Sequence, residues 1–355
     1  MSKLEMRCYQ LLEFGSPLVE SKQFIPAPTG TEVVVGVKGA GVCHSDVHIC
    51  EGFFDLGGGK KAPLGGVTLP LTPGHEIAGE VLAVGPDAKG AKVGDVVLVD
   101  PWIGCGSCHV CSIGDDHLCS KPRFMGLNGN GGFTDCLVVP HSRYLIDLGG
   151  LDPVKMAPYA CSGLTAFGAI KKFQPLLKTQ PIVVIGAGGL GLMSLHILAM
   201  LGAKGAIVIE LDERRRAAAL EAGALAALDP NDPKVVRKVR DLVGGPVMGV
   251  IDFVGSEQTA TLGFNLLGRG GKLVIVGLFG GAVTLPVAMF PSRGVSIEGS
   301  YIGSHAELEE LIELARNREG GPPPIIINPR PLTKANEAIS DLRNGNVVGR
   351  VVLVP

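Results

Sequence analysis

The fold of this chain is decided by the stretch Ile182-Val183-Val184-Ile185-Gly186-Ala187-Gly188-Gly189-Leu190-Gly191. Its four apolar residues predict a buried strand, and the glycine turn after them opens a helix that extends to about Leu201. Gly186 permits a tight turn, Gly188 lets the backbone approach a pyrophosphate, and Gly191 lets helix and strand pack closely. The amide groups at the start of the helix attract phosphate charge. The stretch therefore predicts a dinucleotide-binding unit, with a purely structural glycine turn as the alternative.

The next predicted strand, Ala206–Glu210, ends in an acid 19 residues after Gly191. An acid at this place is expected to bind the ribose hydroxyls of a dinucleotide. Because the Glu210 carboxylate repels a 2′-phosphate, NAD is favoured over NADP. The run Arg214–Arg216 can either hold that phosphate or form the exposed face of a helix, and we prefer the second interpretation.

Strands and helices continue to alternate beyond this unit, which indicates a doubly wound parallel sheet with helices on both faces. The predicted elements are helix 212–222, helix 235–243, strand 249–252, helix 257–267 and strand 272–276. Before Cys161 the sequence instead predicts short strands separated by turns, at residues 32–37, 80–84, 96–99 and 136–139.

After Ser296 the alternation breaks again. Ser304 and Glu307 form a capping-box pattern that opens a helix to about Arg316, and the last predicted strand is Arg350–Val354. We interpret this tail as returning to the first domain. The predicted domains are residues 1–161 with 297–355, and the inserted residues 162–296.

Composition excludes several classes of protein. A net charge of −2 gives no basic surface for nucleic acid or an anionic membrane, and 46% hydrophobic residues supply buried cores. Met1–Gln10 has no apolar core, so we expect no signal peptide. The apolar run Ile182–Gly202 is broken by glycines, as in a buried strand and helix rather than a membrane span. We expect a cytoplasmic protein without nucleic-acid or membrane partners.

Four cysteines are closely spaced as Cys105-x2-Cys108-x2-Cys111-x7-Cys119. Four thiolates can close a tetrahedron around one zinc ion and leave no open position, so this site is expected to stabilise its loop. We name residues 105–119 the four-cysteine lobe. The alternative is that these cysteines are free or form disulfides. A reducing compartment disfavours the disulfides.

A second metal site is suggested by Cys43, His75 and Cys161. Two thiolates and a neutral imidazole balance the charge of Zn²⁺ and leave a fourth position open, as in catalytic sites. The three residues are far apart in sequence, and each can equally be a core residue, because buried free cysteines are common.

Three motifs resemble those of zinc-containing medium-chain alcohol dehydrogenases. They are Gly74-His75-Glu76-x2-Gly79-x5-Gly85-x2-Ala88, Gly41-Val42-Cys43-His44-Ser45-Asp46-x-His48 and Ala160-Cys161-Ser162-Gly163-Leu164-Thr165. The four-cysteine lobe and the nucleotide loop follow in that family's order, so the resemblance covers essentially the whole chain. It implies a Rossmann-type sheet inserted in a β-rich, GroES-like catalytic domain, with NAD and two zinc ions per chain.

The resemblance implies a metal set for the active site. Cys43, His75 and Cys161 would bind the catalytic zinc, and Glu76 would stand behind the metal as an occasional alternative ligand. Asp46 would orient His75 and fix its tautomer, which is a common function of carboxylates next to ligating histidines.

The resemblance also implies a proton path and cofactor contacts. Ser45 would take the alcohol proton and pass it through the cofactor ribose to His48 at the surface. His44 would lie by the cofactor phosphates, and Thr165 near the nicotinamide. Without the family pattern, His44 and His48 can equally be exposed loop histidines, and Ser45 a turn residue.

The substrate is the least determined feature. The long segment Phe53–Lys61 and the stretch Pro101–Cys105 are similar to bacterial enzymes of the 6-hydroxyhexanoate dehydrogenase type, which implies reversible oxidation of primary alcohols or ω-hydroxy acids to aldehydes. Lys60 or Lys61 is a hypothetical partner for the far carboxylate, although a solvated loop is the preferred interpretation. Trp102 either walls the substrate pocket or supports the four-cysteine lobe.

Other functions remain as alternatives. A secondary-alcohol or polyol dehydrogenase is disfavoured by Cys161, because polyol relatives commonly have an acid as the third ligand. A zinc-free reductase would need none of the seven ligands, and a non-catalytic cofactor-binding protein of the same fold is a further candidate. By analogy we expect a homodimer or homotetramer, with the last strand of the nucleotide sheet as a candidate interface.

Overall fold

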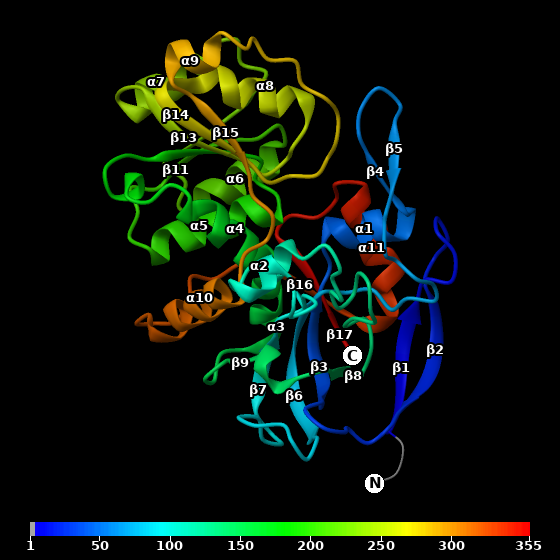
Figure 1. The fold of residues 1–355 in the computed structure, drawn as a ribbon. Helices are drawn as coiled ribbons and strands as arrows, with labels where there is room; N and C mark the ends of the chain where they lie inside the picture. The colour runs from blue at the N-terminus through cyan, green and yellow to red at the C-terminus, as the bar shows by residue number, and fades with distance from the viewer. Residues whose placement is uncertain (1–3) are drawn as a thin grey trace.

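A computed structural model describes residues 4–355, which fold into two lobes (Figure 1). The segments at the two ends of the chain, blue to cyan and red, form the catalytic lobe. The central green-to-gold segment forms the nucleotide lobe. The predicted insertion of one domain in the other is confirmed, because the last strand pairs with strands from the first third of the chain.

The nucleotide lobe contains a six-stranded parallel sheet in the order β12-β11-β10-β13-β14-β15. The strand order reverses at β10, where doubly wound sheets bind dinucleotides. The strands are β10 (Ile182–Ile185), β11 (Ala206–Ile209), β12 (Ala226–Leu228), β13 (Val247–Asp252), β14 (Leu267–Ile275) and β15 (Ser296–Gly299).

Helices cover both faces of this sheet (Figure 1). Ile182 and Val184 of β10 join the core under α5, whereas Val183 and Ile185 join the core under α7 and α8. Both faces of the strand are therefore buried, which explains why it is apolar at every position. The helices are α5 (Gly189–Met200), α6 (Glu213–Glu221), α7 (Val235–Val243), α8 (Glu257–Leu266) and α9 (Met289–Arg293).

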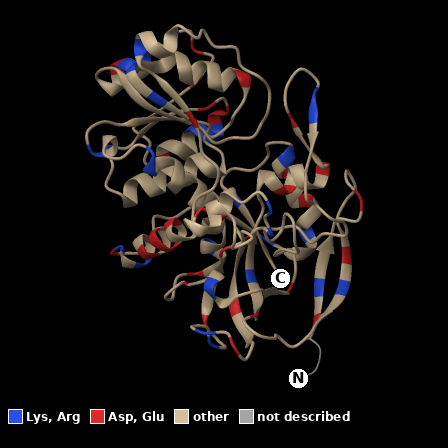
Figure 2. Ribbon diagram, in the orientation of Figure 1, with Lys and Arg blue, Asp and Glu red and all other residues tan. Residues whose placement is uncertain are grey.

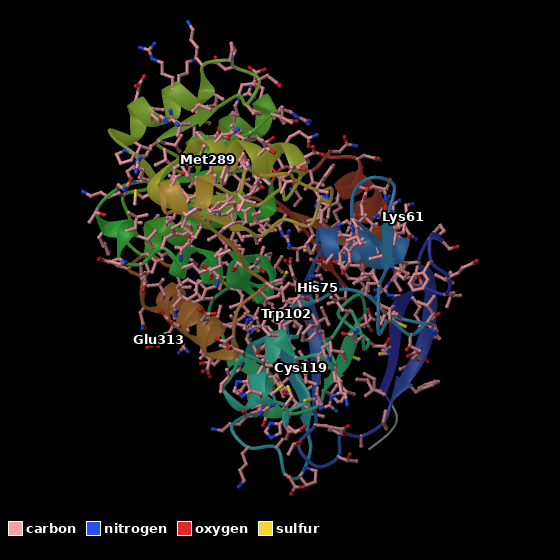
Figure 3. The ribbon with its side chains drawn as sticks, turned by 45° about the horizontal axis from the view of Figure 1, so that its top comes forward. Lys61, His75, Trp102, Cys119, Met289 and Glu313 are labelled. Atoms are coloured by element: carbon pink, nitrogen blue, oxygen red, sulfur yellow. The ribbon has the colours of Figure 1, made fainter. Side chains whose placement is uncertain are left out.

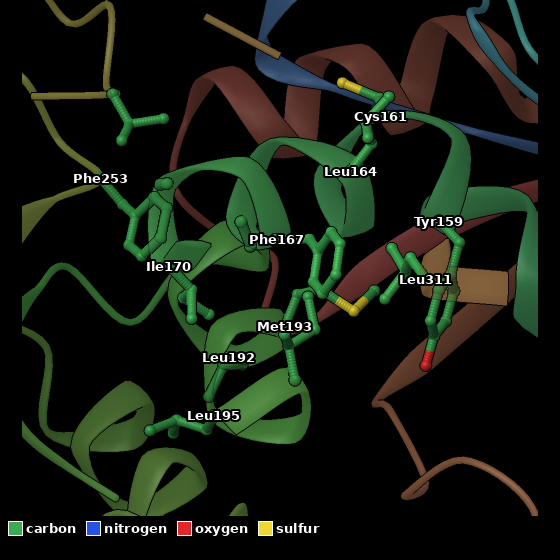
Figure 4. Close-up of a cluster of buried hydrophobic side chains, with 14 of the residues drawn as sticks. Tyr159, Cys161, Leu164, Phe167, Ile170, Leu192, Met193, Leu195, Phe253 and Leu311 are labelled. Atoms are coloured by element: carbon green, nitrogen blue, oxygen red, sulfur yellow. The ribbon is translucent and has the colours of Figure 1, made fainter. Parts of the chain in front are cut away.

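Helix α4 (Ser162–Lys171) packs against α5 and against α10 (His305–Asn317). Figure 4 shows Phe167 of α4 beside Met193 of α5 and Leu311 of α10, and these residues belong to one buried cluster. All α4 residues from Ser162 to Ile170 are buried. Core packing therefore fixes the position of Cys161, which directly precedes the helix.

The catalytic lobe is built on a sheet in the order β16-β17-β3-β6-β7-β9, with β8 also paired to β3. β17 runs antiparallel to β3 and parallel to β16. The strands are β3 (Val33–Gly41), β6 (Glu76–Val84), β7 (Val96–Val99), β8 (Cys136–Val139), β9 (Leu145–Asp147), β16 (Ile327–Pro331) and β17 (Arg350–Val354).

Two hairpins and several short helices complete this lobe. The hairpins pair β1 (Leu4–Gln10) with β2 (Val19–Ile25), and β4 (Phe53–Asp55) with β5 (Lys61–Pro63). The helices are α1 (His44–Glu51), α2 (His109–Ser112), α3 (Pro153–Met156) and α11 (Ala335–Arg343). The 3₁₀ helices of this lobe are Asp116–Leu118, Ser142–Tyr144, Ala157–Ala160 and Leu332–Lys334, and a further one, Leu176–Lys178, precedes β10.

The β4–β5 hairpin extends toward the nucleotide lobe (Figure 1). A Cβ atom at Gly57 would lie 2.7 Å from the carbonyl carbon of Gly281, and one at Gly280 would lie 2.6 Å from the carbonyl oxygen of Asp55. Only glycine allows these backbones to approach so closely. The tip of the hairpin therefore touches the loop after β14.

Most predicted elements are confirmed, with differences at their ends. β6 begins at Glu76 instead of Glu80, and β14 begins at Leu267 instead of residue 272. The predicted capping box is present, because the Ser304 hydroxyl accepts a hydrogen bond from the Glu307 amide at 3.2 Å. The predicted boundary after residue 296 falls inside β15, and the division into domains stays a prediction.

Acidic and basic residues are interspersed over both lobes, and a run of acidic residues marks α10 (Figure 2). Among residues 4–355, no helix has both the length and the apolar character needed to cross a bilayer. We expect no signal peptide in Met1–Gln10, and residues 1–3 of this segment lie outside the described residues.

Candidate active site

Three side chains from separate segments meet at one point. The ligand atoms of Cys43, His75 and Cys161 lie within 4.8 Å of one another, and all three residues are buried. Cys43 directly precedes α1, His75 precedes β6 and Cys161 precedes α4. The two sulfur atoms are 4.0 Å apart, and the hydrogen bond from Cys161 lowers the pKa of the Cys43 thiol. The fold therefore presents two sulfurs and one imidazole to a common centre.

The imidazole of His75 is held from one side only. Its Nδ1 atom lies 3.1 Å from Oδ1 of Asp46, while its buried Nε2 atom has no partner among residues 4–355. Asp46 is fully buried and accepts further hydrogen bonds from the amides of Cys43 (2.8 Å) and Gly74 (3.2 Å). A carboxylate fixed in this way leaves Nε2 free to bind a metal, so the donor set fits zinc.

Glu76 lies next to this cluster and pairs with a residue that the sequence did not single out, Arg350 at the start of β17. Glu76 also accepts a hydrogen bond from the amide of Ser162 at 3.2 Å, and burial raises its pKa to about 7. Its Oε2 atom has no partner in the described chain. One feature of the sequence could have singled out Arg350, because it is the charged first residue of an otherwise apolar strand.

Helix α1 carries the predicted proton-transfer residues. The Ser45 hydroxyl lies 3.9 Å from the Cys43 sulfur, and His48 follows one helical turn later on the same face. The His48 ring is half-buried against Phe54 of the hairpin, 5.3 Å between centroids, and burial lowers its pKa. His44, the first residue of the helix, is exposed. The roles of these residues stay predictions.

The glycine turn between β10 and α5 has the shape that a dinucleotide requires. Gly186 has a φ of 92°, and a Cβ atom at Gly191 would collide with the Gly186 carbonyl oxygen. Apart from Gly188 and its two chain neighbours, no atom of the described chain lies within 4 Å of the Cβ position of Gly188, so there is open space above it. The Glu210 carboxylate accepts a 2.7 Å hydrogen bond from the Ala187 amide, which places it at this turn.

The polar side chains near this turn differ in their hydrogen-bond and ion-pair partners. Arg214 pairs with Asp212 at 2.7 Å, and Arg215 donates to the carbonyl of Gly345 at 3.0 Å. Only Arg214 of the run is exposed as the preferred interpretation expects, whereas Arg215 and Arg216 are half-buried and Arg216 donates to the carbonyl of Glu210 at 2.8 Å. Thr165 of α4 has a buried hydroxyl without a partner in the part of the chain that the structure describes.

The four-cysteine lobe forms a second cluster, with all four sulfurs within 4.8 Å of one another. The sulfurs of Cys108 and Cys111 are 3.4 Å apart, and the sulfur of Cys119 accepts hydrogen bonds from the amides of Cys105 and Lys121, each at 3.3 Å. Cys119, labelled in Figure 3, belongs to this lobe and lies apart from His75.

Comparisons with known proteins agree with this geometry. The profile of the alcohol dehydrogenase GroES-like domain matches residues 29–149, and that of the zinc-binding dehydrogenase domain matches residues 189–317. An NAD-dependent alcohol dehydrogenase of Sulfurisphaera tokodaii is 39% identical over 99% of this chain and 100% of its own. The chain belongs to the zinc-containing medium-chain alcohol dehydrogenase family.

Two further relatives of this alcohol dehydrogenase are informative. The D-arabinose 1-dehydrogenase (NADP⁺) of Saccharolobus solfataricus is 34% identical and covers 97% of this chain and 96% of its own. The crystal structure of an alcohol dehydrogenase from Aeropyrum pernix has a TM-score of 0.85, with 33% identity over 98% of this chain and 100% of that one. The protein is thus an NAD-dependent zinc alcohol dehydrogenase that acts on small alcohols.

Proposed function

We propose that Cys43, His75 and Cys161 hold the catalytic zinc, with Glu76 behind the metal, and that the four-cysteine lobe holds a structural zinc. The observation that carries this proposal is the buried, unpartnered Nε2 atom of His75 beside two thiols. When bound, zinc supplies a Lewis acid that lowers the pKa of a hydroxyl group, as it lowers that of water from about 15.7 to about 7.

Side chains of the protein orient the proposed zinc ligands and carry the alcohol proton away from this site. Asp46 holds the imidazole of His75 in one tautomer and orientation through its 3.1 Å contact with Nδ1. Ser45, beside Cys43, takes the proton of the alcohol, and His48 receives it nearer the surface. Because burial lowers the pKa of His48, this residue is neutral and able to accept a proton near pH 7.

The cofactor contacts are proposed for the edge of the sheet where β10 ends. The turn Gly186–Gly191 is open for the pyrophosphate, and the charge of Glu210 at this turn favours NAD, which accepts the hydride. His44 at the start of α1 is proposed to lie by the phosphates, and Thr165, with its unpartnered hydroxyl, near the nicotinamide.

For the substrate we propose primary alcohols, including ω-hydroxy acids. Trp102, labelled near His75 in Figure 3, packs edge-on against His75 at 5.6 Å and against Phe124 at 5.2 Å. The rings of Trp102 and Phe124 are both buried in the core beside the metal set, so the support for primary alcohols is the similarity of Phe53–Lys61 and Pro101–Cys105 described above. A sugar or other secondary alcohol is the second candidate, supported by the relative named for D-arabinose.

The test is NADH formation with NAD⁺ and 1-hexanol, 6-hydroxyhexanoate or D-arabinose, beside metal analysis of the wild type and Cys43→Ser. We expect two zinc ions in the wild type, one in the variant, and turnover of the primary alcohols only by the wild type. D-arabinose as the best substrate would replace the primary-alcohol proposal. Two zinc ions in Cys43→Ser would refute the metal set.

We also propose that the enzyme is a homodimer or homotetramer and works in the cytoplasm. β15 is the last strand of its sheet, and among the described residues its outer edge pairs with no strand, which leaves it able to pair with a second copy. None of the nine cysteines is in a disulfide, as a reducing compartment requires. Light scattering of the wild type and of a β15 Ile297→Pro variant tests the interface.

A further inference from the structure

Asp100, which directly follows β7, is a buried carboxylate with two partners. It is 1% exposed. Its Oδ1 atom accepts a hydrogen bond from the amide of Trp102 at 3.0 Å, and its Oδ2 atom accepts one from Nδ1 of His305 at 2.6 Å. Both oxygens are therefore occupied, one by the segment that leads to the four-cysteine lobe and one by the first residue of α10.

Trp102 in turn contacts one proposed zinc ligand, His75, and the residue that precedes another, Cys161. Its indole Nε1–H donates a hydrogen bond to the carbonyl oxygen of Ala160 at 2.8 Å, and Ala160 directly precedes Cys161. Its ring lies edge-on to the ring of His75, 5.6 Å between centroids. With 3% of its surface exposed, Trp102 is fixed between these partners.

The contacts close into a ring. α4 begins after Cys161 and packs against α10, and α10 begins at His305. From His305 the path returns through Asp100 to Trp102, and through Trp102 to Ala160 at the start of α4. A side chain held in such a closed set of contacts cannot shift without breaking one of them.

His305 is the most exposed member of this ring and therefore the one most open to substitution. Its side chain is 28% exposed, its Nε2 atom lies 3.5 Å from Glu309, and the ring of Tyr144 packs edge-on at 6.4 Å. Without His305, Asp100 would keep a buried charged oxygen with no partner. The carboxylate would then turn toward water and pull on the amide of Trp102.

We propose that His305 and Asp100 are positioning residues for the catalytic zinc, acting through Trp102 on His75 and Cys161. This inference rests on the proposed metal set. It gives Trp102 a role distinct from walling the substrate pocket: its Nε1–H bond holds the segment that carries a ligand.

The test measures how fast zinc leaves the holoenzyme in excess chelator, read with a colorimetric zinc indicator. Cys43→Ser, which retains the four-cysteine zinc, assigns the phase that belongs to the catalytic zinc. For His305→Ala and Trp102→Phe we expect that phase to be about ten-fold faster, the lower end of the effect of outer partners on metal affinity. The four-cysteine phase should be unchanged.

Two variants separate positioning from general damage. His305→Asn places an amide donor where Nδ1 stands and is expected to restore the wild-type rate. Glu309→Gln removes the exposed neighbour of His305 and is expected to have no effect. Wild-type release from His305→Ala, or equal acceleration of both zinc phases, would overturn the proposal. Two zinc ions in Cys43→Ser would instead overturn the metal set itself, and the inference with it.

Discussion

The guanidinium group of Arg350 forms a buried ion pair with the carboxylate of Glu76, joining residues 274 positions apart in the chain. Glu76 directly follows His75, and the same arginine packs against the start of α5, where a Cβ atom at Gly189 would lie 2.5 Å from Arg350 Cδ. One side chain therefore touches both the residue that follows His75 and the helix of the nucleotide turn.

Replacing Arg350 with methionine is expected to destabilise the protein strongly. The substitution leaves Glu76 buried without its charge partner, and breaking a buried pair from one side costs about 3–5 kcal/mol. Urea unfolding at pH 8 measures the loss. The double variant Arg350→Met with Glu76→Gln should recover most of it, because no buried charge remains.

Arg343→Met is the matched control for this prediction. Arg343 pairs with Glu51 at 3.2 Å, but its side chain is 46% exposed. A surface pair of this kind contributes about 0–1 kcal/mol. Equal losses in Arg350→Met and Arg343→Met would show that the buried pair has no special weight.

The acid limb of alcohol oxidation is expected to report His48. A neutral imidazole accepts the proton, and burial lowers the pKa of His48 below its ordinary value of 6.5. Activity should therefore hold at neutral pH and fall as the pH drops through a value below 6.5. The pH profile of kcat/KM with 1-hexanol measures this, and His48→Gln should lower the plateau and remove that limb. An unchanged profile in His48→Gln would exclude the residue from proton transfer.

His305 is expected to make stability depend on pH in the opposite sense to a paired acid. Burial alone lowers its pKa, but the hydrogen bond and charge of Asp100 outweigh burial and raise the pKa above 6.5. Its contribution is therefore complete below the unfolded value and is lost as the pH rises through the folded value. The difference in Tm between wild type and His305→Asn should be larger near pH 5.5 than near pH 8.5. The reverse order would contradict the pairing.

Removing the zinc of the four-cysteine lobe should loosen that lobe without emptying the other site. Cys111→Ser takes away one of four thiolates in a site where metal binding supplies the local fold. Metal analysis should give one zinc per chain, and trypsin should cut sooner after the exposed Arg123. Ser112→Ala, an exposed change in the same helix, is the control. Loss of both zinc ions in Cys111→Ser would show that the two sites are not independent.

The lysines of the hairpin test carboxylate recognition. Lys61 places its Nζ atom 3.7 Å from the centroid of the Phe53 ring, which holds this cation on the hairpin, and Lys60 is exposed. If either meets the far carboxylate, Lys60→Ala with Lys61→Ala should lower kcat/KM for 6-hydroxyhexanoate about 2–5-fold, the range of an exposed ion pair. The value for 1-hexanol should not change. An unchanged preference between the two substrates would end this hypothesis.

Local patterns carried much of the fold. The apolar run before Gly186 and the glycines after it specify strand, turn and helix within ten residues, and the structure places these elements at Ile182–Ile185 and Gly189–Met200. The return of the last strand was also predictable, because Arg350–Val354 is apolar beyond its first residue and needs a sheet to pair with.

Contacts between distant segments were not predictable in the same way. The pair Arg350–Glu76 depends on the register of β17 against β3, which no local pattern states. The approach of Gly57 to Gly281 depends on how the two lobes face each other. The ring of contacts through Asp100 and His305 was not predicted. No motif surrounds either residue in its own segment, and the partner of each lies 205 positions away in the chain.

The insertion of the nucleotide lobe has a consequence for synthesis on the ribosome. Cys161, the last of the three clustered ligands, emerges well before Arg350, and at about 5–20 residues per second the interval is roughly 10–40 s. During that interval the nucleotide sheet can fold while Glu76 still lacks its arginine and β3 lacks β17. The nascent chain thus acquires the three side chains proposed to bind zinc first, and the buried Arg350–Glu76 pair beside them last.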